Sequence, residues 1–417
     1  MGVFILTAAV AWLAFALLRP TPPRTVAMAV GPEGSTSALF GSRYREILAR
    51  DGITLHLVPT AGAVASAALL RDPKSGVSIS ILPSGITNPK ESPGLVSLGT
   101  LFYEPLWLFF RGDADTSHES LRNLRISIGP EGSGSRALAL EFFARAGIID
   151  QVSDHLLPLL PSEASEQLLR GEIDGAVLLS AWDTSHVQKL LTAHDIRLLN
   201  MRRADAWVAL YPFLNKVILP AGVANMAQNL PPNDVVLLAP KASLVVRTDL
   251  HPAIPYLLLD AATQIHSEPG LFCRAGQFPA AESIDLPLSE EASQFYKTGR
   301  PFFQRHLPFW LAVLLQQFFV LLIPILGVLY PLLKIAPGAY AWAMRRRVYK
   351  LYDELKLLEE EIGSEVAGGF SRDNVISRLD RLEERVAHFW VPVDFEPLIY
   401  ELRSHIRLVR ERLERSA

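Results

Sequence analysis

Over residues 24–306, short apolar runs alternate with longer segments in which apolar residues recur at every third or fourth position. Short apolar runs bounded by turn residues indicate buried strands, and the wider spacing indicates amphipathic helices. Strands that alternate with helices in this way form parallel sheets joined by right-handed crossovers. The pattern therefore predicts an α/β protein over this part of the chain.

Two segments depart from the pattern because they carry no charged residue. Residues 2–18 are close to the minimum length that spans a ~30 Å hydrocarbon core, and residues 307–333 are long enough to span it with tilt. No Lys or Arg precedes the first segment, whereas a signal peptide begins with a positive region. We therefore predict two transmembrane helices, an uncleaved anchor at residues 1–19 and a second span at 307–333. A cleaved signal peptide and a buried soluble helix are the respective alternatives.

Basic residues set the expected orientation in the membrane. Lys334, the run Arg345–Arg347 and Lys350 follow the second span, and such clusters lie on the cytoplasmic side. We therefore expect the tail, residues 334–417, and the N-terminus to be cytoplasmic. Residues 24–306 are then extracytoplasmic, at the cytoplasmic (inner) membrane of a bacterium.

The pentapeptide GPEGS occurs twice, at Gly31 and at Gly129, each time after an apolar run and before a helical pattern. The match continues beyond it, because the next apolar runs, TLHLVPT and HLLPLLPS, are each followed by a further helical pattern and a third apolar run. Chance similarity of turns explains the pentapeptide but not the shared order, which points to a duplicated unit. Each copy is predicted to form a strand, helix, strand, helix, strand unit and thus one lobe.

Two extended apolar segments, residues 97–111 and 233–249, connect the expected lobes. A chain that leaves one lobe, builds the second and returns leaves a cleft between them, where α/β proteins bind ligands. We therefore predict a two-lobed solute-binding domain. It takes residues 24–306, with lobe 1 at about 24–105 and 235–290 and lobe 2 at about 112–230.

The tail, residues 334–417, has apolar residues at helical spacing over 340–362, 372–390 and 397–415. Acidic and basic residues balance along it. This pattern predicts a cytoplasmic helical hairpin with solvated faces.

Composition narrows the function classes. The net charge of −3 and the pI near 6.4 give no basic excess for nucleic acid. The single cysteine, Cys273, excludes an internal disulfide and a cysteine-based zinc site, and the histidines are scattered. We expect no nucleic-acid partner, no metal and no cofactor.

Each GPEGS turn leads into the start of a helix. There the backbone N–H groups lack helical acceptors and the helix dipole is positive, which favours a carboxylate or phosphate. If both starts face the cleft, an anion is held from each lobe, and Arg136 or Arg43 can add charge. N-capping by the serines alone is the alternative. The candidate ligand-binding residues at the turns are Gly34, Ser35, Thr36 and Ser37, and Gly132, Ser133, Gly134, Ser135 and Arg136.

Four further candidates lie in a connecting segment and at strand ends. Tyr103 and Glu104 can hydrogen-bond a ligand amine or hydroxyl, or Glu104 can pair with a surface arginine. Ser84 and Trp182 follow the third apolar run of each copy, where the clefts of α/β sheets form, although either can be ordinary packing.

Sequence motifs of known enzyme classes give only weak matches in this chain. GSGSRA from Gly132 fits GxGxxA, but no acidic residue is fixed on the next strand, and no P-loop, GxSxG or HExxH pattern occurs. We expect a binding protein and not an enzyme.

Taken together, these residues resemble the TAXI family, the solute receptors of certain tripartite ATP-independent periplasmic (TRAP) transporters, and in particular its membrane-anchored branch. The resemblance rests on GPEGSTSALFGSRY, ISIGPEGSGSRALALEFFARAGI, LRGEIDGAVLLSA, and FYKTGRPFFQRHLPFWLA before the second span. It implies a type II periplasmic-binding-protein fold, closure of two lobes on an organic anion, and delivery to a separate permease.

The expected function is therefore capture of a small organic anion or amino acid for a TRAP-type transporter. The alternative is a ligand sensor that signals through its second transmembrane helix and the cytoplasmic helices. Two anchors and a structured tail favour the sensor, because a carrier needs neither.

Overall fold

The computed structural model describes residues 22–112, 124–152, 155–299, 309–363 and 372–415. The chain divides into two compact units, one holding residues 20–316 and the other residues 317–417. The larger unit contains every strand of the described residues and consists of two α/β lobes.

A mixed sheet forms the centre of lobe 1, with strands in the order β2-β1-β3-β11-β4. β1 runs parallel to β2 and β3, and β11 runs antiparallel to β3 and β4. The elements are β1 (Thr25–Val30), α2 (Thr36–Arg50), β2 (Thr54–Pro59), α3 (Ala63–Arg71), β3 (Ile79–Pro83) and β4 (Leu95–Tyr103), with a 3-10 turn at Pro73–Ser75.

Residue size along β1 decides how the helices of lobe 1 pack. Successive side chains of a strand point to opposite faces of the sheet. Val26, Met28 and Val30 face the core formed with α2 and α9 (Ala253–His266), whereas Ala27 and Ala29 face α3. Small alanines leave room for α3 to approach the sheet closely, so both faces are covered and the strand is buried.

Lobe 2 repeats this arrangement. Its sheet has the order β7-β6-β8-β5, with β7 and β8 parallel to β6 and β5 antiparallel to β8. The elements are β6 (Ile126–Ser127), α4 (Gly134–Arg145), α5 (Ile149–Val152), β7 (Leu156–Leu157), α6 (Pro161–Arg170), β8 (Gly175–Leu179), α7 (Ser185–Leu191), β9 (Ile196–Leu198), α8 (Ala204–Leu210) and β10 (Leu214–Leu219).

The predicted duplication is confirmed by the strand pairing. In each lobe the first strand of the repeat is flanked by the second and third strands, both parallel to it, and an antiparallel strand pairs with the third. The GPEGS turns join equivalent elements, β1 to α2 and β6 to α4. The order of apolar runs in the sequence was therefore sufficient to predict the lobes.

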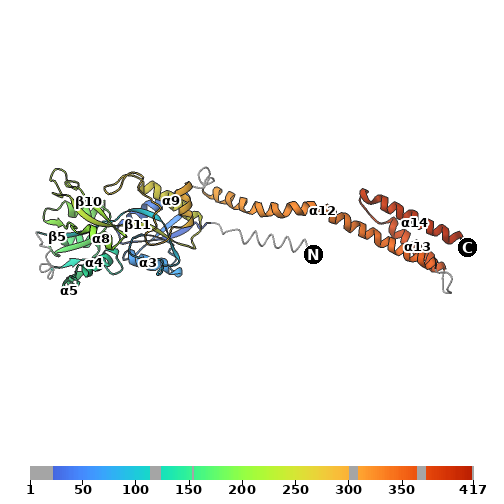
Figure 1. The fold of residues 1–417 in the computed structure, drawn as a ribbon, viewed down its shortest axis with the longest axis horizontal. Coiled ribbons are helices and arrows are strands. Elements are labelled where there is room, and N and C mark those ends of the chain that lie inside the picture. Colours follow the sequence, from blue (N-terminus) through green and yellow to red (C-terminus); the bar gives the residue numbers. More distant parts are fainter. Residues whose placement is uncertain (1–21, 113–123, 153–154, 300–308, 364–371, 416–417) are drawn as a thin grey trace. The chain divides into compact units, whose positions relative to one another are not determined.

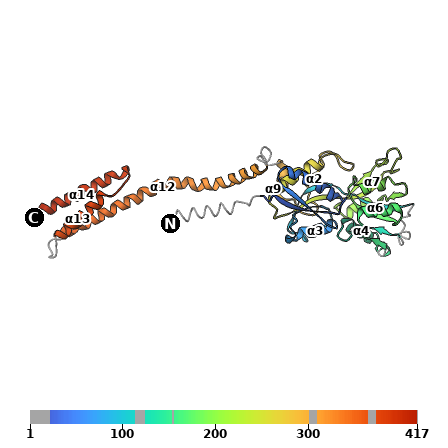
Figure 2. The same cartoon turned by 180° about the vertical axis from the view of Figure 1, so that it is seen from behind.

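The strand β5 (Leu106–Arg111) is buried on both faces of lobe 2. Leu106, Leu108 and Phe110 pack against α4 and α8, and Trp107 and Phe109 pack against α6 and α7. α6 and α7 lie side by side on that face (Figure 2). Because both faces of β5 are buried, all residues from 106 to 110 are apolar and do not alternate with polar ones.

Two segments cross between the lobes, as the sequence predicted. β4 continues through Glu104 and Pro105 into β5, and β11 (Val235–Arg247) belongs to both sheets (Figure 1). Its first half pairs with β10, and its second half pairs with β3 and β4. The chain then returns to lobe 1 as α9 and α10 (Glu290–Thr298). The larger unit is therefore a mixed α/β domain of two lobes.

The smaller unit is helical. Its elements are α12 (Phe309–Gly363), which begins in the larger unit, α13 (Arg372–Ala387), a 3-10 turn at Val393–Phe395, and α14 (Glu396–Arg415). Apolar residues at heptad-like spacing on α12, α13 and α14 meet in one core. Ion pairs such as Arg385 with Glu354, at 2.7 Å, flank this core. The predicted hairpin is thus a three-helix arrangement, because residues 348–358 of α12 supply the third apolar face.

The predicted transmembrane segments are not supported. Residues 1–19 lie outside the described residues, and most of residues 307–333 falls on α12. Within the described part of the chain, no helix is long and apolar enough to cross a membrane.

Truncating Leu402, which is 0% exposed in the core of the smaller unit, should destabilise that unit. Leu402→Ala removes buried methyl groups and leaves a cavity, so we expect a loss of about 2–5 kcal/mol. Amide hydrogen exchange of the full chain should become faster in α13 and α14. Leu408→Ala is the matched control, because Leu408 is 53% exposed. Equal effects of the two substitutions would contradict the three-helix core.

Candidate ligand-binding cleft

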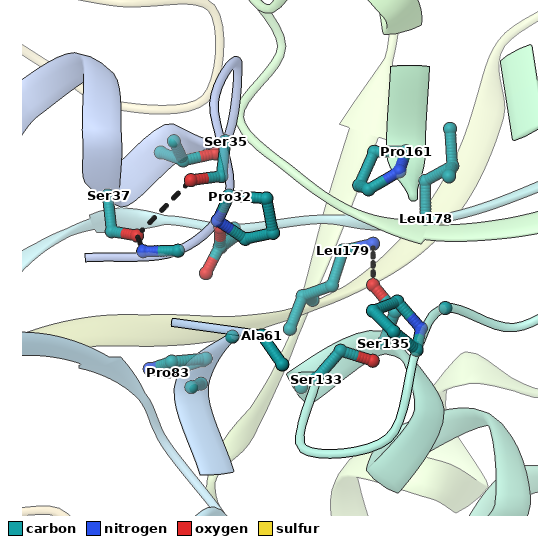
Figure 3. Close-up of a pocket in the computed structure, with 18 of the residues that line it drawn as sticks. Pro32, Ser35, Ser37, Ala61, Pro83, Ser133, Ser135, Pro161, Leu178 and Leu179 are labelled. Carbon is teal, nitrogen blue, oxygen red and sulfur yellow. Dashed lines mark hydrogen bonds between the residues drawn. The ribbon is translucent and has the colours of Figure 1, made fainter. Parts of the chain in front are cut away.

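The two GPEGS turns face each other across a cleft between the lobes. The cleft holds about 660 Å³ of space not filled by atoms, part of which is open to solvent. Its walls come from the ends of β1, β3 and β8 and the starts of α2, α3, α4 and α6. Figure 3 shows Pro32, Ser35, Ser37, Ala61 and Pro83 of lobe 1 opposite Ser133, Ser135, Pro161, Leu178 and Leu179 of lobe 2.

The serine of each GPEGS caps the helix that follows. Ser35 and Ser133 have extended backbones, and their hydroxyls accept from the N–H groups of Ala38 at 3.3 Å and Arg136 at 3.2 Å. Each serine follows a glycine with positive φ, and Gly132, for example, has φ +83°. This left-handed backbone suits glycine and turns the chain from strand to helix. Capping and cleft lining are therefore combined in the same residues.

The next two residues of each helix carry backbone N–H groups for which the described structure records no acceptor. They belong to Thr36 and Ser37 of α2 and to Gly134 and Ser135 of α4, and all four residues line the cleft. Unsatisfied N–H groups at a helix start, together with the positive end of the dipole, form a site for an anion. Two such sites meet here.

The hydroxyls of Ser37 and Ser135 hold the strand ends in place. Ser37 Oγ accepts from the N–H of Gly31 at 2.8 Å, and Ser135 Oγ accepts from the N–H of Leu179 at 2.9 Å. Each hydroxyl keeps its own proton for donation. Ser37 thus fixes its own turn after β1, whereas Ser135 fixes its turn against the end of β8.

The lobes contact each other directly across the cleft. The N–H groups of Val64 and Ala65, at the start of α3, donate to the carbonyl oxygen of Gly132 at 2.9 and 3.0 Å. From the other lobe, the N–H of Ala181 donates to Thr36 Oγ1 at 2.8 Å. These bonds exist only while the lobes are together, so the structure is a closed form.

Glu104 lies where the chain crosses from β4 to β5, and it is the sole ionisable residue among the described residues that line the cleft. It is 8% exposed. Burial raises the pKa of its carboxyl group to about 7, and a hydrogen bond from the Thr36 side chain opposes this rise. A carboxyl group in this range changes charge near neutral pH.

The structure brings seven of the predicted site residues to the cleft and leaves six away from its walls. Those that line it are Ser35, Thr36, Ser37, Glu104, Ser133, Gly134 and Ser135. Those that do not are Gly34, Gly132, Ser84, Tyr103, Arg136 and Trp182.

The predicted residues away from the cleft have structural explanations. The hydroxyl of Ser84 donates to the carbonyl of Lys241 at 2.8 Å. The ring of Tyr103 packs on Phe278, and Trp182 packs against the core of lobe 2. Gly34 and Gly132 shape the turns through their positive φ angles.

The two arginines expected to add positive charge are not among the residues that line the cleft. Neither Arg136 nor Arg43 lines it, and Arg43 instead lies over the ring of Phe40, 5.4 Å from the ring centre. A position near a helix start does not fix the direction of a side chain, because residues on adjacent helical positions point about 100° apart. The candidate anion-binding groups among the lining residues are therefore backbone N–H groups.

Several lining residues were missed from the sequence. They comprise a small-residue turn after β2 and an apolar wall, and the chief members are Ala61, Gly62, Ala63, Ile81, Phe102, Leu178 and Leu179. The signal for the turn was its place at the carboxyl end of a parallel strand, where such clefts form. Nothing in the apolar strands distinguished wall residues from core residues.

Fold and cleft together define the class of this protein. It is a two-lobed α/β protein with a candidate small-molecule site between the lobes. Residues 46–298 match the model of the NMT1-like family, which covers more than half of the chain. The chain belongs to the NMT1-like family. No curated protein is similar enough in sequence to count as a relative.

Several solved structures are similar to part of this chain at low sequence identity. A protein from Bordetella bronchiseptica RB50 is 14% identical, with a TM-score of 0.41 over 59% of this chain and 72% of its own. The alkanesulfonate-binding protein SsuA from Xanthomonas axonopodis pv. citri, bound to MOPS, is 13% identical, with a TM-score of 0.37 over 59% and 74%. The aliphatic sulphonate-binding protein SsuA from Escherichia coli is 12% identical, with a TM-score of 0.37 over 58% and 72%.

Substituting Gly62 should hold the lobes apart. A Cβ added to Gly62 would lie 2.7 Å from Ser133 Cα, and backbone on the opposite wall cannot yield as a flexible side chain can. In Gly62→Ala we expect a longer distance between spin labels at the exposed residues Arg50 and Arg170, one on each lobe.

Gly76→Ala is the control for this substitution. Gly76 also has a positive φ, of +73°, but no atom lies within 4 Å of its added Cβ. It therefore tests backbone strain without a clash. An unchanged distance in Gly62→Ala would show that the lobes do not close through this contact.

Proposed function

We propose that this chain is an extracytoplasmic solute-binding protein that captures a small organic anion or amino acid between its lobes. The observation that carries the proposal is the meeting of two helix starts at one cleft, each with two backbone N–H groups that lack an acceptor. Membership of the NMT1-like family and the closed two-lobed architecture support it. The proposal assigns binding and no catalytic step.

The partner we propose is a TRAP-type permease that takes the solute from the cleft. This step rests on the resemblance of the GPEGS turns and the following helices to the TAXI receptors. Closure over a ligand and release on opening are what such delivery requires, and the lobe contacts at Gly132 and Thr36 are of the kind that closure makes.

We further propose that the protein is tethered to the cytoplasmic membrane, with its tail inside the cell. The support is in the sequence, where residues 307–333 lack charge and Arg345–Arg347 follow them. Fractionation of cells that express the full chain tests this proposal. Release of the protein by a salt wash would contradict it, because a spanning helix resists such extraction.

A bound solute should raise the thermal stability of the full chain. A ligand at about 100 times its Kd stabilises the form that binds it by ~2.7 kcal/mol. We expect an upward shift of the melting temperature with one class in a panel of monocarboxylates, dicarboxylates, sulfonates and amino acids. No shift with any member of the panel would contradict solute capture.

Replacing Gly134 by proline tests whether the helix start holds the ligand. Proline is favoured at the first position of a helix and removes its N–H, so the fold should persist. We expect weaker binding of the solute found in the panel, by the loss of a charge-assisted hydrogen bond of about 1.5–3 kcal/mol. Glu290→Pro is the matched control, at the first position of α10 and outside the cleft.

The alternative function is a ligand sensor, and the core shared by α12, α13 and α14 favours it, because a carrier needs no such bundle. Under the transport proposal, deleting residues 372–417 should leave solute uptake and affinity unchanged. Uptake in cells and calorimetric titration measure the two quantities. If uptake stayed intact but solute-dependent gene expression were lost, the sensor function would be favoured.

A further inference from the structure

We propose that Glu104 is the specificity determinant of the cleft and pairs with a positively charged nitrogen of the ligand, so that the solute is a small α-amino acid and not a simple carboxylate. This inference rests on the proposed function and deepens it.

The cleft offers a buried carboxyl group and no cation to accompany it. Glu104 is buried, and no Lys, Arg or His belongs to the described residues that line the walls. An ionised carboxylate in such a place is costly unless a positive charge pairs with it. Because the walls supply none, a ligand is the source of that charge.

None of the described charged side chains on the elements around Glu104 lines the cleft. On α4, Arg136 follows the lining residue Ser135, and its Nη1 is buried without a hydrogen-bond partner. On β11, Lys241 binds Glu282 at 2.7 Å. On α2, the charged residues are exposed to solvent and none lines the cleft; they are Arg43, Arg45, Glu46 and Arg50. On β4, the Tyr103 hydroxyl accepts from Gln277. On α7, the buried His186 bonds the Ser180 hydroxyl, and burial lowers its pKa to about 4, so it is neutral.

The raised pKa of Glu104 is that of a buried carboxyl group without a cationic partner. Its pKa rises to about 7 because burial disfavours the charged form, and the hydrogen bond from Thr36 opposes the rise only in part. A ligand ammonium beside the carboxyl group would lower this pKa again. Binding of a cation and ionisation of Glu104 are therefore coupled.

Thr36 places the acidic group and the anion site close together. Its side chain lies close enough to the Glu104 carboxyl group to lower the pKa of that group, while its backbone N–H, at the first position of α2, has no recorded acceptor. One residue thus touches both charge-binding features. A ligand that uses both must carry its ammonium and carboxylate within a few bonds of each other, as an α-amino acid does.

The rest of the wall indicates the side chain of the ligand. It is apolar and includes Ile81, Phe102, Leu178 and Leu179, and the remaining positions are mainly Gly, Ala, Pro and Ser. A charged ligand side chain would find no partner there and would lose its hydration. The site therefore suits a short apolar side chain.

Matched pairs of ligands test the inference on the full chain in detergent. L-Alanine and L-valine each have a 2-hydroxy acid of the same shape, L-lactate and 2-hydroxyisovalerate, which lack the ammonium group. By isothermal titration calorimetry we expect the amino acids to bind at least tenfold more tightly. Equal or tighter binding of the hydroxy acids would overturn the role of Glu104 and leave solute capture standing. If none of these ligands nor any member of the wider panel bound, the proposed function itself would fail.

The pH dependence of binding gives a second test that needs no variant. Below about pH 7 the unliganded Glu104 is protonated, so an ammonium ligand must displace its proton. Affinity for L-alanine should fall about tenfold per pH unit as the pH drops below 7. An affinity for L-alanine that rose as the pH fell would show that the ligand binds with neutral Glu104, and would overturn the pairing.

Glu104→Gln completes the test. The amide keeps the shape of the side chain and an acceptor for Thr36 but cannot ionise. We expect affinity for L-alanine to fall about 30-fold or more, as when one partner of a buried charge pair is lost, and its pH dependence to disappear. Affinity for L-lactate should change little.

Asp285→Asn is the matched control. Asp285 is a partly buried carboxyl group with a pKa raised by burial to about 6, but it accepts from the N–H of Gly85 outside the cleft. Its substitution should leave the preference for L-alanine over L-lactate intact. Wild-type affinity for L-alanine in a folded Glu104→Gln protein would overturn the proposal.

Discussion

Backbone N–H groups at the start of a helix have no acceptor inside the helix, and the fold of this chain leaves two pairs of them at one cleft. The pairs meet because a strand-turn-helix unit is duplicated and the copies are joined by strands that cross between two sheets. Each GPEGS turn needs a left-handed glycine before its capping serine, so the same five residues shape the turn and cap the helix. Without the turn in one lobe, only the N–H groups of the other lobe's helix would remain at the cleft.

The closed form depends on backbone N–H groups at the start of α3, which also lack an acceptor within their own helix. Its N-cap residue is Gly62, which has no side chain to cap the helix, and the N–H groups of Val64 and Ala65 instead donate to Gly132 of the other lobe. When the lobes separate, water replaces that carbonyl. A hydrogen bond exchanged for one to water is worth only about 0.5–1.5 kcal/mol net. Closure is thus close to balanced by itself, and a ligand that contacts both walls can tip the equilibrium.

The sequence predicted the features that follow from the order of apolar runs, turns and helical segments along the chain. The apolar order of the two repeats predicted the strands, the parallel pairs in each lobe and the position of both helix starts, and Ser35 and Ser133 line the cleft. It did not predict the antiparallel strands β5 and β11 that make both sheets mixed. It failed where side-chain direction decides. Arg136 is next to Ser135 in the chain but does not line the cleft, and Tyr103 precedes Glu104 but faces Phe278. The apolar wall of the cleft was not predicted either. A strand buried on both faces shows no alternation of apolar and polar residues, so its pattern does not mark the side chains that line a cleft.

Charge balance connects the helix starts with Glu104, which lies where the chain crosses from β4 to β5. Each helix dipole acts as roughly +0.5 of an elementary charge at its N-terminus, so two starts supply about one positive charge. That amount matches one carboxylate and leaves nothing for Glu104, whose own negative charge would repel the same ligand. A cleft with two helix starts and one unpaired buried acid is neutralised by a ligand that carries one charge of each sign. Burial in the closed form strengthens both interactions, because water no longer screens them. The position of Thr36, which takes part in both halves of the site, then makes closure and charge recognition a single event.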